Sequence, residues 1–290
     1  MLMIERIADL RRQVSLWRQA GERIALVPTM GNLHAGHLQL VDAARGPADR
    51  VVVSIFVNPM QFSDAGGGDF EHYPRTFESD RKKLVENGVD LLFFPAQEEM
   101  YPAGFKDVTQ VQVPGISDIL CGEFRPRHFV GVATVVAKFF NMVQPDVAVF
   151  GEKDYQQLLV IRRFTGELCF PVEIIGVATV READGLAMSS RNQYLSVEER
   201  RRAAALYRVL QAASERLASG ETDIAAIESA AIACLKDAGF RPEYFTVRRA
   251  YDLQPAAMDD AELVILAAAW LGEARLIDNL PLRRQCTVPV

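Results

Sequence analysis

The chain is poor in cysteine and has no long apolar run. Four of its 290 residues are cysteines, and no two stand close enough to form a C-x-x-C metal or redox motif. So few cysteines in a chain of this length are typical of a reducing compartment. The longest apolar run, Leu263 to Leu271, is far shorter than the ~20 residues of a membrane-spanning helix. These absences argue against a metal-binding or redox protein built on a C-x-x-C motif and against a membrane-spanning protein.

An excess of positive charge is also missing. The formal net charge is −6 and the sequence pI is about 5.4, which argues against a general binder of nucleic acid or membrane surfaces. A local basic pocket remains compatible with this acidic whole. Charged residues from Glu5 to Arg12 leave no room for the apolar core of a signal peptide. We therefore expect a cytoplasmic protein that binds neither nucleic acid nor membrane.

Two common phosphate-binding motifs are absent. The chain has no G-x-x-x-x-G-K-[ST], and no G-x-G-x-x-G frame surrounds its one glycine cluster, Gly66 to Gly68. We expect that cluster to be a flexible loop. The composition, 49% hydrophobic and 24% charged, is ordinary for a soluble globular protein with a sizeable core. The length allows one large domain or two smaller ones.

Up to about residue 180, short apolar runs alternate with amphipathic stretches. Runs that are apolar throughout are typical of strands buried on both faces, as in a parallel sheet. The alternation predicts a doubly wound α/β domain, in which ligands bind at the carboxyl ends of the strands. The expected strands are Ile24–Val27, Val51–Val57, Leu91–Phe94, Val147–Phe150 and Val172–Val177, and the expected helices are Leu38–Arg45, Thr76–Asn87, Val132–Val143 and Asp154–Phe164.

The pattern changes near residue 190. Two helical stretches follow, the first from Val197 to Ala218 with Ser196 as its N-cap, the second from Ile224 to Asp237. Short strand-like segments come after them. We predict a smaller α+β domain over residues 189–290, after a Rossmann-like domain over residues 1–188 that binds the ligand. The expected strands are Tyr244–Val247, Leu263–Ala268 and Ala274–Ile277.

The stretch P-T-M-G-N-L-H-A-G-H, Pro28 to His37, is the most informative one. It lies between the first expected strand and its helix, so His34 and His37 fall in the first helical turn. Free N–H groups and a partial positive charge attract phosphate to such a turn, and imidazoles add hydrogen bonds. A nucleotide is the natural ligand. Zinc is a weaker alternative, because a third ligand at a recognisable spacing is missing.

Other polar segments follow expected strands or turns, each with a plain alternative. Lys153 could neutralise phosphate or be solvated, and the D-G-L-A-M-S-S-R-N segment from Asp184 could bind phosphate or be a polar interdomain turn. Asn58 and Gln61 could bind a small polar ligand or be ordinary turn residues. The same holds for Tyr155-Gln156-Gln157. The segment from Cys121 to Phe129 is a basic loop that could gate an anion or simply lie at the surface.

Five motifs in order resemble one family closely, the pantothenate synthetases (pantoate–β-alanine ligases). They are P-T-M-G-N-L-H-A-G-H, F-V-N-P-M-Q-F, F-R-P-R-H-F-x-G-V-A-T-V-V, F-G-E-K-D-Y-Q-Q-L and D-G-L-A-M-S-S-R-N-Q-Y-L-S, over roughly residues 24–196. The C-terminal W-L-G-E-A-R-L-I-D-N is also similar. The one departure is Ser63 to Gly68, where the family more often has an acidic loop with proline.

The resemblance implies a nucleotidylyltransferase-type Rossmann domain, a smaller α+β C-terminal domain, and commonly a homodimer. It implies that ATP, with Mg²⁺, drives the condensation of pantoate with β-alanine through a pantoyl adenylate, giving pantothenate, AMP and pyrophosphate. His34, His37 and Lys153 would act on the ATP phosphates, with His37 as proton donor, and Gln61 and Gln157 would hold pantoate. The metal ligands are not identified. The ATP-binding residues would be Met30, Gly31, Asn32, Leu33, His34, Ala35, Gly36, His37, Gly151, Glu152, Lys153, Asp154, Val180, Met188, Ser189, Ser190 and Arg191.

Two other hypotheses compete with this one. A nucleotidylyltransferase acting on another acid or phosphate would share the paired histidines and Ser-Ser-Arg, although Gln61 and Gln157 argue against it. A non-catalytic nucleotide sensor is the third, and retention of every expected phosphate contact argues against it.

Overall fold

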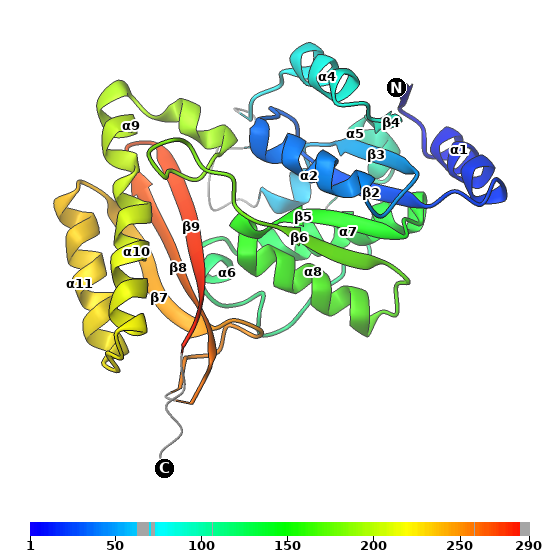
Figure 1. The fold of residues 1–290 in the computed structure, drawn as a ribbon. Coiled ribbons are helices and arrows are strands. Elements are labelled where there is room, and N and C mark those ends of the chain that lie inside the picture. Colours follow the sequence, from blue (N-terminus) through cyan, green and yellow to red (C-terminus); the bar gives the residue numbers. More distant parts are fainter. Residues whose placement is uncertain (63–69, 71–72, 106, 258, 285–290) are drawn as a thin grey trace. The chain divides into compact units, whose positions relative to one another are not determined.

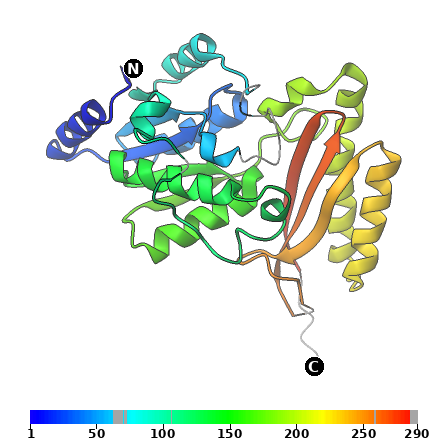
Figure 2. The same ribbon diagram turned by 180° about the vertical axis from the view of Figure 1, so that it is seen from behind.

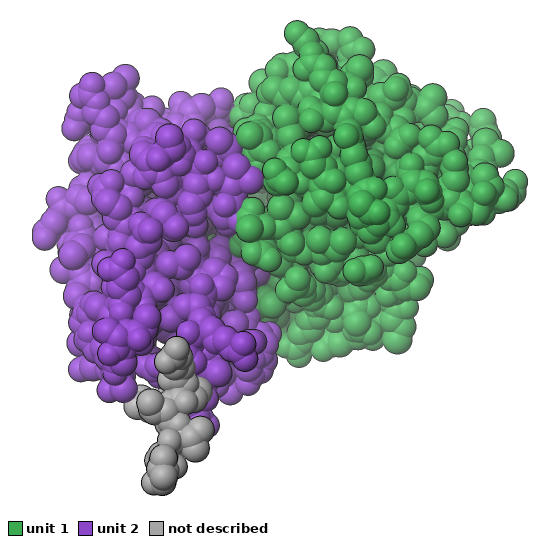
Figure 3. Space-filling model, viewed as in Figure 1, with its two compact units in different colours: residues 1–152, 156–178 green, residues 153–155, 179–290 purple. Residues whose placement is uncertain are grey.

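A computed structural model describes residues 1–62, 70, 73–105, 107–257 and 259–284. Within these residues the chain forms two compact units, coloured separately in Figure 3: residues 1–152 and 156–178 make unit 1, and residues 153–155 and 179–290 make unit 2. The expected loop at Ser63–Gly68 lies outside the described residues.

Unit 1 is built on a parallel sheet flanked by helices (Figure 1). In the described residues it has six strands in the order β1-β4-β3-β2-β5-β6, and neighbouring strands pair in parallel. The central strands are mostly apolar and mostly buried because both faces of the sheet are covered. The strands are β1 (Leu2–Ile4), β2 (Ile24–Thr29), β3 (Arg50–Ile55), β4 (Leu91–Phe93), β5 (Val147–Gly151) and β6 (Glu173–Val177).

Helices connect these strands in the alternating order of a doubly wound domain. Leu40, Val41 and Ala44 of α2 pack on one face of the sheet, in a core that includes Val27 and Val53. The helices are α1 (Ile7–Gln19), α2 (Ala35–Arg45), α4 (Phe77–Glu86), α5 (Gln97–Met100), α6 (Cys121–Phe124), α7 (His128–Val143) and α8 (Tyr155–Glu167), with 3-10 turns η1 (Pro59–Gln61) and η3 (Glu152–Asp154).

The strand order reverses between β2 and β5. From β2 the chain moves through β3 to β4 on one side, whereas β5 pairs with the other side of β2 and is followed by β6. Such a switch point leaves a crevice at the carboxyl ends of the two strands, where ligands of doubly wound sheets bind. The fold therefore brings the carboxyl ends of β2 and β5 next to each other within unit 1.

Unit 2 combines an antiparallel sheet with helices, most clearly seen in Figure 2. Among its described residues three strands, β7 (Arg241–Arg249), β8 (Glu262–Leu271) and β9 (Ala274–Arg283), pair in chain order. Helices α10 (Ala205–Ala218) and α11 (Ile224–Asp237) cover one sheet face with Leu, Ile and Ala side chains. The helix α9 (Val197–Ala203) and the turn η4 (Ser190–Tyr194) precede them.

The fold class agrees with the sequence prediction, with local differences. The helical run from Val197 is split at Ala204, and Ser196 caps its first part with Glu199. The expectation of a loop from Cys121 to Phe129 was wrong: α6 occupies its first four residues, and α7 begins at His128. The strand β1 and helix α1 were not expected.

The chain passes from unit 1 to unit 2 between residues 178 and 179, whereas the predicted domain boundary lies between residues 188 and 189. The segment before residue 189 belongs to unit 2 because Arg181 pairs with Ala187 across a turn and binds Asp278 of β9. The functional boundary at 188/189 stays a prediction. No helix in the described ranges is both long and apolar enough to cross a membrane.

Candidate active site

His34 and His37 cap each other at the start of α2. His34 is the N-cap residue with extended backbone, and its Nδ1 accepts a hydrogen bond of 3.1 Å from the Gly36 N–H. The His37 Nδ1 accepts from the His34 N–H at 3.2 Å. The ring centroids are 4.1 Å apart. Because each Nδ1 accepts a backbone proton, a neutral ring carries its own proton on Nε2.

This geometry changes which groups can bind phosphate. The sequence led us to expect free N–H groups in the first helical turn, and that expectation was wrong for His34 and Gly36. The N–H groups of His34 and Gly36 donate to the imidazoles, and those of Asn32 and Leu33 donate to a carboxylate. The N–H groups of these four residues are therefore engaged within the protein, and each imidazole, when neutral, holds its own proton on Nε2.

The carboxylate belongs to Asp80 of α4, which nothing in the sequence distinguishes from a surface carboxylate. Its side chain is buried, and its Oδ2 accepts from the Asn32 N–H at 2.7 Å while Oδ1 accepts from the Leu33 N–H at 2.8 Å. The Thr76 hydroxyl donates to Oδ2 at 3.0 Å. The Lys83 ammonium donates to the Leu33 carbonyl at 2.6 Å. Helix α4 thus holds the turn between β2 and α2 from both its N–H and its carbonyl side.

Close packing reinforces this turn. Gly31 has a φ of +86°, and a Cβ there would lie 3.1 Å from Ile55 Cγ2 and 3.2 Å from Asp80 Oδ2. The next residue, Asn32, also has positive φ. Glycine at position 31 therefore serves both the backbone conformation and the close approach of Asp80.

The segment after β3 presents Gln61 from a buried network. The Asn58 amide donates to Gln61 Oε1 at 3.2 Å, and Asn58 Oδ1 accepts from the Tyr101 hydroxyl at 2.9 Å. Gln61 Nε2 contacts Met30 Sδ at 2.9 Å, so two predicted site residues meet here. His128 Nδ1 lies 2.9 Å from the Gln61 carbonyl. Burial raises the pKa of Tyr101 well above its ordinary value, which keeps the hydroxyl a donor.

The end of β5 and the turn η3 that follows it carry the next predicted residues. Gly151 and Glu152 lie in unit 1, beside the carboxyl end of β2, whereas Lys153 and Asp154 are counted in unit 2. All four are half-buried. Gln157 is also half-buried, on α8 of unit 1.

The neighbouring Gln156 has a structural role. Its amide donates to the carbonyls of Ile116 and Ile119 at 2.7 and 2.8 Å, and its carbonyl accepts from the Cys121 N–H at 3.1 Å. These bonds fix the first turn of α8, which also carries Gln157.

In unit 2 the third predicted segment is folded back on itself. The Met188 N–H donates to the Val180 carbonyl at 2.9 Å, so these two residues lie side by side. Ser189 then caps η4, its hydroxyl accepting from the Arg191 N–H at 3.2 Å. Ser190 is the first residue of η4.

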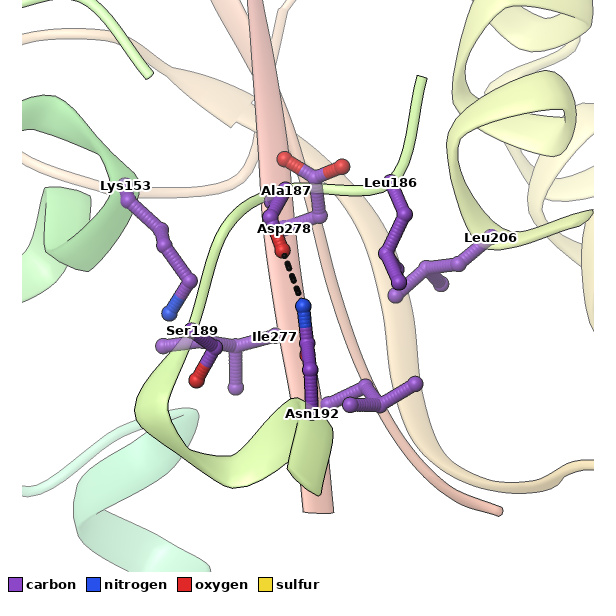
Figure 4. Close-up of a pocket in the computed structure, with 9 residues that line it drawn as sticks. Lys153, Leu186, Ala187, Ser189, Asn192, Leu206, Ile277 and Asp278 are labelled. Atoms are coloured by element: carbon purple, nitrogen blue, oxygen red, sulfur yellow. Dashed lines mark hydrogen bonds between the residues drawn. The ribbon is translucent and has the colours of Figure 1, made fainter. Parts of the chain in front are cut away.

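Lys153 and Ser189 line one small cavity of unit 2, shown in Figure 4. Asn192 and Asp278 add polar groups to its wall, and Leu186 and Leu206 are among its apolar ones. The cavity volume is about 10 Å³, roughly the room for one water. Within the described residues Asn192 Oδ1 is buried without a hydrogen-bond partner, while its amide donates to the Ala187 carbonyl at 3.1 Å. The cavity shows that Lys153 and the Ser189 segment, 36 residues apart in sequence, converge.

Unit 1 is a nucleotidylyltransferase-type Rossmann domain with polar side chains at the ends of β3, β2 and β5, and unit 2 is an α+β domain. Comparisons with known proteins identify the family. Residues 2–281 match the family model of pantoate–β-alanine ligase. The chain therefore belongs to the pantoate–β-alanine ligase family, and it is a ligase that condenses pantoate with β-alanine.

Individual relatives are similar in sequence to this chain over nearly its whole length. The pantothenate synthetase of Thioalkalivibrio sulfidiphilus is 58% identical over 274 residues, 94% of this chain and 95% of that one. The pantothenate synthetase of Azotobacter vinelandii is 54% identical over 280 residues, 97% of this chain and 98% of its own.

Solved structures agree as well. A pantothenate synthetase from Thermus thermophilus superposes with a TM-score of 0.90 at 48% identity, covering 97% of this chain and 99% of that one. A pantoate–β-alanine ligase from Francisella tularensis, solved with β,γ-ATP and β-alanine, has a TM-score of 0.80 at 31% identity, with 97% of each chain covered.

Proposed function

We propose that the ligase works in two steps, through a pantoyl adenylate. A carboxylate oxygen of pantoate attacks the α-phosphorus of ATP, a new O–P bond forms, and pyrophosphate leaves with the electrons of the broken P–O bond. The amine of β-alanine then attacks the acyl carbon, loses a proton, and expels AMP. Adenylation is needed because oxide is too poor a leaving group for direct amide formation.

The first step brings two anions together, so the site needs local positive charge and rigid positioning. We assign His34, His37 and Lys153 to the ATP phosphates, with His37 as the proton donor. Its Nδ1 accepts from the His34 N–H, so Nε2 is the nitrogen that holds the donated proton. This reciprocal capping is the observation that carries the assignment.

The remaining assignments follow the same segments. Arg191 and the hydroxyls of Ser189 and Ser190 would bind phosphate oxygens, and Gln61 and Gln157 would hold pantoate. The ATP site would be formed by Met30, Gly31, Asn32, Leu33, His34, Ala35, Gly36, His37, Gly151, Glu152, Lys153, Asp154, Val180, Met188, Ser189, Ser190 and Arg191. The ligands named for the Francisella tularensis structure, a β,γ-ATP and β-alanine, support these substrates.

We propose that Mg²⁺ arrives with ATP as part of the substrate. Across the residues that the structure describes, no group of three or more His, Cys, Asp or Glu side chains could hold a metal. We therefore propose that the ligands of the ion are mainly phosphate oxygens and water, as is usual for magnesium bound with nucleotides. Its chemistry would be to neutralise phosphate charge.

We also propose a homodimer that acts in the cytoplasm, in line with the resemblance and the low cysteine content.

The test of this function is AMP release from MgATP with pantoate and β-alanine, supplied separately and together. We expect AMP and pantothenate in equal amounts only with both substrates, and enzyme-bound pantoyl adenylate with pantoate alone. AMP formation that does not depend on pantoate, or no AMP formation at all by the folded protein, would contradict the proposal. Activity on another acid acceptor would instead identify a different nucleotidylyltransferase.

A further inference from the structure

Two polar residues stand buried side by side in β9. Asp278 and Asn279 are each only 3% exposed, although Leu276 and Leu280 of the same strand pack into or against the apolar core of unit 2. Burying an amide or a carboxylate is unfavourable unless its hydrogen bonds are satisfied. The contacts of these two side chains therefore show what they hold in place.

Asp278 fixes the segment before Met188. Its carboxylate binds the Arg181 guanidinium through two hydrogen bonds of 2.6 and 3.0 Å, and it also accepts from the Asn279 N–H at 2.8 Å. The same guanidinium lies 3.7 Å from the ring centroid of Tyr207. Desolvation raises the pKa of Asp278, while the Arg181 guanidinium favours its ionised form.

Asn279 fixes the turn that carries Lys153. Its side-chain amide donates to the main-chain carbonyl of Lys153 at 2.9 Å, across 126 positions of sequence. Lys153 lies in the 3-10 turn η3, which has three residues and none of them buried. So short a turn, with only half-buried residues, has little packing of its own to fix the direction of the lysine side chain. The bond from β9 supplies that constraint within unit 2.

The two contacts meet at one place. Lys153, Ser189 and Asp278 line the same small cavity (Figure 4). The Asp278-Asn279 pair therefore connects the turn of Lys153 with the segment that leads to Ser189.

We propose that Asn279 is a positioning residue for adenylation: it holds the Lys153 backbone so that the ammonium meets the ATP phosphates. The inference rests on the proposed role of Lys153. A misplacement of about 1 Å in a group that stabilises a transition state costs up to ~10²-fold in rate. We expect Asn279→Ala to lower kcat/KM for ATP in the pantoate-dependent release of pyrophosphate by about 10-fold or more.

Asn279→Asp is the second variant, because it keeps the side-chain shape and replaces the N–H donor by an oxygen that repels the Lys153 carbonyl. It should lose at least as much activity as the alanine variant, and it keeps the test open if the alanine variant does not fold. Thr246→Val is the matched control. It removes a buried hydroxyl of β7 that donates to Glu228 at 2.9 Å, and it should lower the unfolding temperature with little change in kcat/KM.

A double-mutant cycle with Lys153→Ala separates positioning from general stability. If Asn279 acts through the ammonium, Asn279→Ala should cost about 10-fold in the native background and almost nothing in the Lys153→Ala background. Equal losses in both backgrounds, or kinetics like those of Thr246→Val, would overturn the inference while leaving the role of Lys153 intact. Near-native activity of Lys153→Ala alone would instead overturn the role of Lys153, and the inference with it.

Discussion

Replacing Asp80 by asparagine should loosen the turn that carries the two histidines. The carboxylate accepts three hydrogen bonds, from the N–H groups of Asn32 and Leu33 and from the Thr76 hydroxyl. An amide of the same shape has only one acceptor oxygen. Placing that oxygen toward Asn32 and Thr76 is the less costly choice, and it leaves an NH₂ group facing the N–H of Leu33.

The magnitude follows from these contacts. A buried N–H without an acceptor costs about 1–3 kcal/mol, and exchanging a charged for a neutral acceptor weakens the remaining bonds by about 1 kcal/mol. We therefore expect Asp80→Asn to lower the free energy of unfolding of unit 1 by about 2–4 kcal/mol. Because His34 follows Leu33 directly, the variant should also raise the KM for ATP and lower adenylation by about 10-fold or more.

The assay is urea unfolding followed by circular dichroism, combined with pyrophosphate release at a temperature where the variant is folded. Hydrogen exchange, read by mass spectrometry, should show the loss of protection over residues 30–38. The matched control is Asp90→Asn. Asp90 also accepts from a backbone N–H, that of Val51 at 2.9 Å, and from Arg50 at 3.0 Å, but it precedes β4 at the opposite end of the sheet. That control should destabilise unit 1 and leave the KM for ATP unchanged. An Asp80→Asn enzyme with native stability and native KM would refute the reasoning.

Three further outcomes are expected. Gly31→Ala should destabilise unit 1 by about 1–3 kcal/mol in urea unfolding, because alanine is strained at φ +86° and crowds its neighbours; an unchanged midpoint would contradict this. Tyr101→Phe should cost about 1–2 kcal/mol by the same measurement, since Asn58 Oδ1 loses the shorter of its two hydrogen bonds and keeps only the Met60 N–H as donor. The KM for pantoate should rise in that variant because Asn58 holds Gln61, and a native KM would argue against the assigned role of Gln61. His37→Ala and Lys153→Ala should each lower adenylation by about 10²-fold with the fold intact by circular dichroism; near-native turnover in both would remove their assigned roles.

The architecture could be predicted because it depends on local patterns. β2, β3 and β5 are buried on both faces, so their runs of Val, Ile and Leu identify them without any knowledge of neighbours. The position of His34 and His37 after the first such strand then follows from the general rule for ligand sites in doubly wound sheets. β1 and β4 have three residues each, but β4 is fully buried and follows an amphipathic helical stretch, whereas Leu2 and Met3 of β1 are exposed and precede the alternating pattern.

The supports of the site could not be predicted, because each depends on a contact between distant residues. Asp80 stands in F-E-S-D-R-K-K, a charged helical segment like many surface helices, and only the fold places it against Leu33, 47 positions earlier. Asn279 reaches Lys153 in the same way. Tertiary hydrogen bonds of this kind leave no periodic signal in the sequence.

Asp80 also affects both the charge and the rigidity of the turn at the proposed phosphate site. A carboxylate beneath the turn takes up the N–H groups of Asn32 and Leu33 and adds a negative charge that opposes an anionic ligand. The Lys83 ammonium, bound to the Leu33 carbonyl in the same turn, offsets part of that charge. These bonds fix the backbone of the turn before ATP binds, so His34 and His37 need no reordering on binding. Removing the charge at Asp80 therefore has two opposite effects on ATP affinity, less repulsion and a looser turn. The loosening should dominate, because a charge acts weakly over distance in a hydrated site, whereas the donor positions must be accurate to a fraction of an ångström.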